Sequence, residues 1–148
     1  GLLQAVIDQL DTEILARLAL VQAQAATPFE GLVEENVAFI EMALDPEVQR
    51  IMLLDGPAVL GDPSQWPNQT ACLRRAADLI RGLVEAGTLK PVDPEATARL
   101  LNGAALSASL WVAAADEPQT VLRHTVAVFR ELATGLLKQD ASQAPATS

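Results

Sequence analysis

Hydrophobic residues recur along this chain with the three- and four-residue spacing of α-helices. In residues 2–25 one stripe contains Leu3, Val6, Ile7, Leu10, Ile14, Leu18 and Val21. The same spacing predicts further helices at 28–44, at 46–54, from 63–68 to Gly87, at 94–115 and at 118–138. No segment alternates with the two-residue period of a half-buried strand. The sequence therefore predicts an all-α fold, an orthogonal or antiparallel bundle of about six helices.

Proline residues mark where most of these helices begin. Proline is tolerated at the first helical position after a capping Thr or Asp, as in Thr27-Pro28, Asp45-Pro46, Asp62-Pro63 and Asp93-Pro94. Glu117-Pro118 is a weaker version of the same signal. These boundaries predict one domain over residues 1–138, followed by a mobile polar tail at 139–148.

An apolar run from Arg50 to Gly61 is interrupted in its middle by Asp55-Gly56-Pro57, and Trp66 follows. Such a break keeps neighbouring helices from closing tightly, because Pro57 cannot continue a helix begun before it. A ligand pocket is therefore predicted here, lined by large apolar side chains and a few polar ones. The candidate lining residues are Phe39, Met42, Met52, Leu53, Val59, Trp66, Thr70, Asn102, Leu106, Leu110 and Trp111. Asn102 is the best single candidate for a polar ligand contact, although a structural hydrogen bond explains it equally well.

The last two predicted helices carry more apolar surface than one domain needs. The segment from Ala96 to Ala115 is apolar or small on every face, which is typical of a buried helix. The two helices are predicted to form a homodimer interface by four-helix packing; the alternative is that they only close the core of a monomer. The candidate interface residues are Ala104, Ala108, Ala115, Val121, Leu122, Val126, Phe129, Leu132 and Leu136.

Composition restricts the classes of function. The net charge of −9 argues against DNA binding by this chain alone, since such affinity comes largely from Lys and Arg at phosphates. No apolar run reaches the length of a membrane span, and the single cysteine, Cys72, fits a reducing compartment. We therefore expect a cytoplasmic protein.

Residues able to carry catalysis are sparse. His124 is the only histidine, and its helical neighbours offer no metal ligand or orienting group. The acidic residues Glu34, Glu35, Glu41 and Asp45 and the basic pair Arg74-Arg75 are interpreted as solvated helix faces, and Cys72 as a core or pocket residue. Hence no catalytic residue, metal site or cofactor is predicted.

Several motifs, taken in order, resemble the regulatory domain of TetR-family transcriptional regulators. They are the Leu54-Asp-Gly-Pro57 turn with Trp66, Glu85-Ala-Gly87 before Leu89-Lys-Pro91, Leu100-Leu-Asn-Gly-Ala104, and an Ala-Asp-Glu-Pro118 corner before the last helix. The resemblance implies a homodimer through the last two helices and an effector cavity among the others. It also implies that the protein is a repressor, in which effector binding releases operator DNA from paired helix-turn-helix domains.

In TetR-family relatives, polar residues often occupy the positions near Leu106-Ser107. Because Leu106 is apolar, we expect a small, mainly apolar effector. The first helix opens at Leu2 without a capping residue, which favours a chain preceded by a DNA-binding domain that this sequence does not contain. The alternative function is a stand-alone helical carrier or dimerisation module for apolar small molecules.

Overall fold

Six α-helices and one short 3-10 segment make up the part of the chain that the computed structural model describes, residues 1–51, 53 and 67–139. The helices are α1 (Leu2–Gln24), α2 (Pro28–Glu41), α3 (Pro46–Arg50), α5 (Pro67–Glu85), α6 (Pro94–Ala114) and α7 (Pro118–Thr134), with the 3-10 segment η1 at Met42–Leu44. No strand occurs within these residues, so the predicted all-α bundle is confirmed. None of the described helices is both long and apolar enough to cross a membrane.

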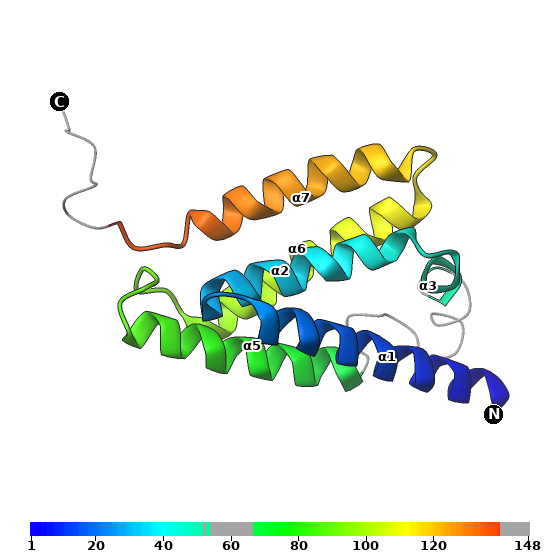
Figure 1. Cartoon of the computed structure of the whole chain (residues 1–148), viewed down its shortest axis with the longest axis horizontal. Helices are drawn as coiled ribbons and strands as arrows, with labels where there is room; N and C mark the ends of the chain where they lie inside the picture. Colours follow the sequence, from blue (N-terminus) through cyan, green and yellow to red (C-terminus); the bar gives the residue numbers. More distant parts are fainter. Residues whose placement is uncertain (52, 54–66, 140–148) are drawn as a thin grey trace.

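The helix α2 lies at the centre of the bundle (Figure 1). It packs against α1 on one side and against α6 and α7 on the other, while α5 packs mainly against α6. In Figure 1 α7 lies at the top, α1 and α5 lie at the bottom, and α2 and α6 overlap between them. This arrangement leaves α2 in contact with nearly every other long helix.

The predicted caps form at three helix starts. The Thr27 hydroxyl accepts a hydrogen bond from the Glu30 amide at 3.1 Å, and Asp45 and Asp93 carboxylates accept from the Glu47 and Ala96 amides at 2.8 Å. Each cap satisfies a backbone donor that the first turn of a helix leaves without a partner. The pair Asp62-Pro63 lies outside the described residues.

Two predicted helix ends were wrong by several residues. The second helix ends at Glu41 because its last turn tightens into η1. The last helix ends at Thr134 because the Lys138 amide donates to the Thr88 carbonyl and the Lys90 amide donates to the Leu136 carbonyl, both at 2.9 Å. Those bonds hold the chain after α7 against the loop after α5.

That loop turns at Gly87, whose φ of 81° lies in the left-handed region. The Thr88 amide there donates to the Leu83 carbonyl at 2.9 Å and the Gly87 amide donates to Val84 at 3.1 Å. This is the Schellman pattern expected of glycine at a helix C-terminus.

The core is divided into two clusters. The larger joins α2, α5, α6 and α7 around Val37, Ile80 and Val112. The smaller joins α1, α3 and α6 and contains Ile7, Leu10, Val48, Ile51 and Leu106. Phe39 packs against both, so the two clusters meet at α2.

Candidate functional site

A cavity of about 330 Å³ lies where the two core clusters meet. This volume falls at the lower end of the range of small-molecule sites, roughly 300–1,000 Å³. Its wall is built from α1, α2, η1, α3, α5 and α6. The lining residues are Leu10, Asp11, Ile14, Leu15, Leu18, Ala19, Gln22, Leu32, Glu35, Asn36, Phe39, Met42, Val48, Ile51, Cys72, Arg75, Ala76, Leu79, Asn102 and Leu106.

One end of the cavity is apolar. Leu10 and Ile14 of α1 face Met42 and Val48 there, and Leu106 closes the wall from α6. Residues four apart on a helix share a face, which is why a single stripe of α1 supplies so much of this wall. This end can hold an apolar body but offers it little hydrogen bonding.

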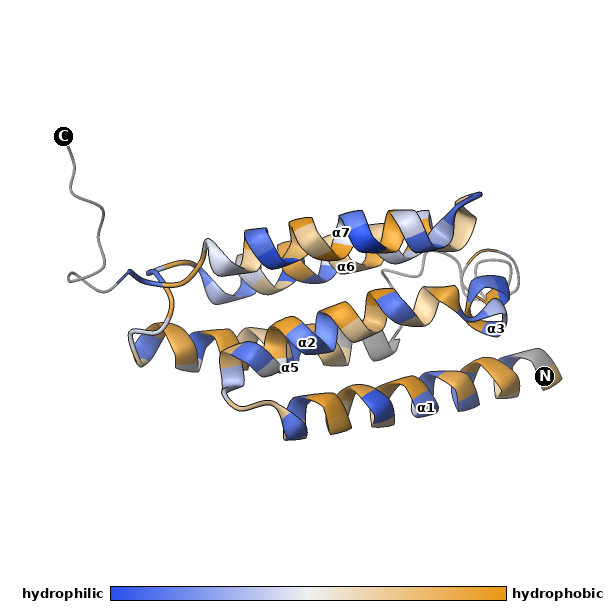
Figure 2. Ribbon diagram, turned by 45° about the horizontal axis from the view of Figure 1, so that its top comes forward, coloured by the Kyte–Doolittle hydropathy of each residue, from blue (hydrophilic) through white to orange (hydrophobic). Residues whose placement is uncertain are grey.

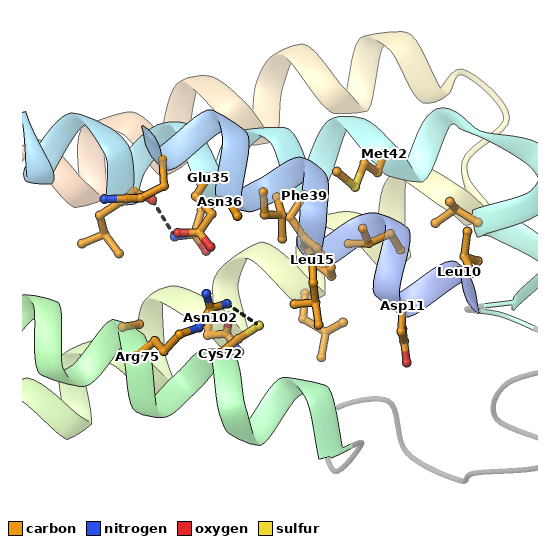
Figure 3. Close-up of a pocket in the computed structure, with 18 of the residues that line it drawn as sticks. Leu10, Asp11, Leu15, Glu35, Asn36, Phe39, Met42, Cys72, Arg75 and Asn102 are labelled. Carbon is orange, nitrogen blue, oxygen red and sulfur yellow. Dashed lines mark hydrogen bonds between the residues drawn. The ribbon is translucent and has the colours of Figure 1, made fainter. Parts of the chain in front are cut away.

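The other end is polar. In Figure 3 Glu35 and Asn36 of α2 lie across the cavity from Arg75, Cys72 and Asn102. The Asn36 amide donates to the Leu32 carbonyl at 2.8 Å, and the Arg75 guanidinium donates to the Cys72 sulfur at 3.5 Å. Partial burial raises the pKa of the Glu35 carboxyl above its ordinary value, and the charge of Arg75 lowers it by a smaller amount.

The structure brings four of the predicted ligand residues together at this cavity, namely Phe39, Met42, Asn102 and Leu106. Leu110 packs beside the smaller core cluster, and Leu53 is 38% exposed. Trp111 lies on the outer face of α6 and is 59% exposed. Met52, Val59, Trp66, the turn at 54–57 and the side chain of Thr70 lie outside the described residues.

The interpretation of Glu35 as a solvated residue was wrong, because Glu35 is half-buried and lines the cavity. Arg75 also lines the cavity but is exposed. A signal for Glu35 was present in the sequence: it lies three residues after Leu32 and four before Phe39, both on the apolar face of α2. The residues of α1 were also missed as lining residues, since helical spacing shows which residues share a face but not what that face meets.

A second surface lies on the outer side of α6 and α7. Four large hydrophobic side chains there are more than half exposed, namely Leu100, Trp111, Val128 and Leu132. Among the predicted interface residues, Leu132 lies on this surface, whereas Phe129 and Ala108 are 3% and 8% exposed inside the chain's own core. Ala104, Ala115, Val121, Leu122, Val126 and Leu136 are half-buried. Figure 2 shows hydrophobic residues recurring along both helices.

The buried positions of Phe129 and Ala108 show which predicted interface residues the chain's own core already covers. An α-helix that packs on a core with one face and on a partner with the other needs apolar residues on both. The sequence showed a wide apolar arc on the last helix, but the structure decides which part of that arc is already covered within the chain.

Comparisons with known proteins agree with this architecture. Residues 29–136 match the family described as "Tetracyclin repressor-like, C-terminal domain". The crystal structure of a TetR-family transcriptional regulator from Pectobacterium atrosepticum is similar, with a TM-score of 0.83 and 37% sequence identity over 94% of this chain and 72% of that one. No curated protein matches the chain.

The fold and cavity thus define a helical regulatory domain of a transcription factor. The chain belongs to the TetR family, and its described helices form the C-terminal domain that binds effectors and dimerises in such regulators. The family consists of non-enzymatic transcription factors.

Proposed function

We propose that this chain is the effector-sensing and dimerisation part of a cytoplasmic TetR-type repressor, and that a small, mainly apolar ligand causes release of operator DNA. The observation that carries the proposal is the cavity of about 330 Å³ between the two core clusters. Its walls come from nearly every helix, so a ligand inside it contacts elements that are far apart in sequence. Domain 1–138 acts as one unit in this proposal, joined to DNA through a helix-turn-helix domain.

The effector would act by a shift of population. A ligand changes the balance between two arrangements only if it binds one of them more tightly, and typical couplings are about 1–3 kcal/mol. Here α2 is the element best placed to respond, since it lines the cavity and packs against α7.

The dimer interface in this proposal is the outer surface of α6 and α7 with Leu100, Trp111, Val128 and Leu132. Large exposed hydrophobic side chains concentrated on two adjacent helices are unusual for a monomer. A two-fold axis between α6 and α7 of two copies would cover all four of them.

The ligand site is tested by filling it. Leu106→Trp places an indole in the cavity and is expected to weaken binding of the apolar dye Nile red by about tenfold or more, because the ligand and the indole compete for one volume. Leu20→Trp is the control, since Leu20 is 62% exposed on α1 and does not line the cavity. Ala19→Trp, at the exposed side of α1, fills the cavity from the opposite wall without disturbing the core.

Fluorescence titration measures the dye affinity, and circular dichroism verifies folding. Unchanged affinity in both folded cavity variants would overturn the proposal. Native mass spectrometry of the purified chain gives an independent result: a two-chain mass carrying a small adduct supports it, and a bare monomer contradicts the dimer interface.

A further inference from the structure

Glu35 places a half-buried carboxyl group at the polar end of the cavity. It forms no hydrogen bond or ion pair with any residue that the structure describes. Arg75 is near enough to influence its charge, but the guanidinium donates to the Cys72 sulfur instead. A half-buried carboxylate of this kind is poorly solvated, and any group that donates to it is favoured.

A second acceptor lies at the same end of the cavity. The Gln22 amide oxygen of α1 is buried and accepts no hydrogen bond among the described residues. The Gln22 side chain lies directly over Gly31, where a Cβ would come within 2.6 Å of that oxygen. Gly31 and Glu35 are four residues apart on α2, so they share one face of the helix. The polar end therefore presents two acceptors to which no described residue donates a hydrogen bond.

The charges around the cavity also favour a cation. The polar end carries the carboxylate of Glu35 and one basic side chain, Arg75, which is exposed and therefore largely screened by solvent. The chain as a whole carries a net charge of −9, which raises the local concentration of cations near it.

We propose that the effector is an apolar molecule ending in a protonated amine, with Glu35 as its counter-ion and the Gln22 amide oxygen as a second acceptor. This inference rests on the proposed function, because it assigns the ligand class of the same cavity. The apolar body lies against Leu10, Ile14 and Met42, and the ammonium group lies between α1 and α2.

An ammonium group fits better than the two alternative polar ends. A neutral hydroxyl can donate one hydrogen bond, whereas hydrogen bonds between two charged groups are roughly twice as strong as those between neutral ones. A carboxylate would favour Arg75 but would lie opposite Glu35, and two carboxylates in one poorly solvated site repel each other.

The test compares three ligands with the same apolar chain: octylamine, octanol and octanoate. Isothermal titration calorimetry at neutral pH is expected to give octylamine an affinity about tenfold or more above that of octanol, and octanoate the weakest. In Glu35→Gln the preference for the amine over the alcohol is expected to disappear. The substitution keeps the shape of the side chain and removes only its charge.

Glu30→Gln is the matched control. Glu30 lies on the same helix, is exposed and does not line the cavity, so its variant should retain the preference for octylamine. Equal preference in wild type and Glu35→Gln would overturn the assignment of Glu35. Tight octanoate binding that is lost in Arg75→Gln would also overturn the inference, because it would make Arg75 the recognition group.

Two kinds of failure are distinguishable. Binding of all three compounds without preference for the amine overturns the ligand class alone and leaves the cavity as a ligand site. Absence of binding by all three compounds and by Nile red overturns the proposed function and this inference together.

Discussion

Arg130 of α7 forms a two-point ion pair with Glu34 of α2, in which both guanidinium nitrogens donate to the carboxylate. Glu34 directly precedes Glu35, and the two neighbours point to different sides of α2 because consecutive helical residues are about 100° apart. One acidic residue thus contacts α7 while the next lines the cavity. The helix α2 is consequently a direct physical link between the ligand site and α7.

The strength of this ion pair can be predicted from its exposure. Its side chains are 46% and 43% exposed, so solvent screens the attraction and we expect a coupling of about 0.5–1 kcal/mol. A double-mutant cycle with Glu34→Gln and Arg130→Met, followed by urea unfolding, measures it. The coupling should decrease in high salt. A coupling that salt leaves unchanged would mean that the pair is stabilised by more than exposed charges.

Neighbouring residues of α7 should respond differently to truncation. Phe129→Ala removes a ring that is 3% exposed in the core, and a loss of about 3–5 kcal/mol in the free energy of unfolding is expected. Leu132→Ala, at a residue 55% exposed, should weaken dimerisation in sedimentation experiments without changing the monomer fold.

Leu20→Ala is the control for Leu132, since Leu20 is 62% exposed on α1, away from α6 and α7. If Leu20→Ala and Leu132→Ala had the same effect on the dimer, the surface of α6 and α7 would not be the interface.

The helix caps give a prediction with an internal comparison. Asp93→Ala removes the carboxylate that accepts from the Ala96 amide at 2.8 Å, and it should destabilise the chain by about 1 kcal/mol. Glu117→Ala, at the cap position of α7, should have little effect because its side chain makes no capping hydrogen bond. Thermal unfolding of both variants measures the difference. Equal losses would show that the side-chain cap is not what stabilises the start of α6.

The raised pKa of Glu35 predicts how stability depends on pH. The folded chain binds a proton at Glu35 more readily than the unfolded chain does, so this residue's contribution to stability falls as pH rises from about 4.5 through the folded pKa. Without ligand, Glu35→Gln should therefore be more stable than wild type at neutral pH, and the difference should disappear below the ordinary value of 4.5.

Denaturant unfolding over a series of pH values measures this trend, and Glu30→Gln accounts for the general effect of removing one negative charge from α2. A Glu35→Gln variant that is less stable at neutral pH would mean that the folded chain stabilises the carboxylate.

We predict that the substitution Gly31→Ala stabilises the folded chain. A Cβ at residue 31 would come within 2.5 Å of the Gln22 amide nitrogen, but that amide is the end of a flexible side chain and can move. Gly31→Ala should therefore gain up to about 1 kcal/mol from helix propensity, reduced by the cost of moving Gln22. Gly82→Ala is the control that measures the gain from helix propensity alone, since a Cβ at residue 82 would meet nothing within 4 Å.

Unfolding experiments on both glycine variants compare the two gains, and octylamine affinity reports whether displacing Gln22 weakens the ligand site. A Gly31→Ala variant less stable than wild type would show that the surroundings hold Gln22 firmly in place.

Part of the candidate site could be predicted from the sequence, and part could not. Asn102 was identified because a polar residue among apolar neighbours is conspicuous in the sequence of α6, and Leu106 because relatives often carry polar residues near its position. Trp111, on the same helix, lies outside instead, because five residues separate it from Leu106 and place it on a different face. An apolar side chain looks the same in sequence whether it lines a cavity or a partner surface.

The sequence by itself determined the helices, their capped starts at Pro28, Pro46 and Pro94, and the turn at Gly87. These features depend on residues within four or five positions of each other, so local hydrogen bonding and periodicity are sufficient to define them. Only the tertiary structure decided that α1 closes the cavity, that Glu35 lines it while Glu34 binds Arg130, and that Phe129 is covered within the chain. Those outcomes depend on how helices far apart in sequence cross and which faces they present to each other, and helical periodicity fixes neither.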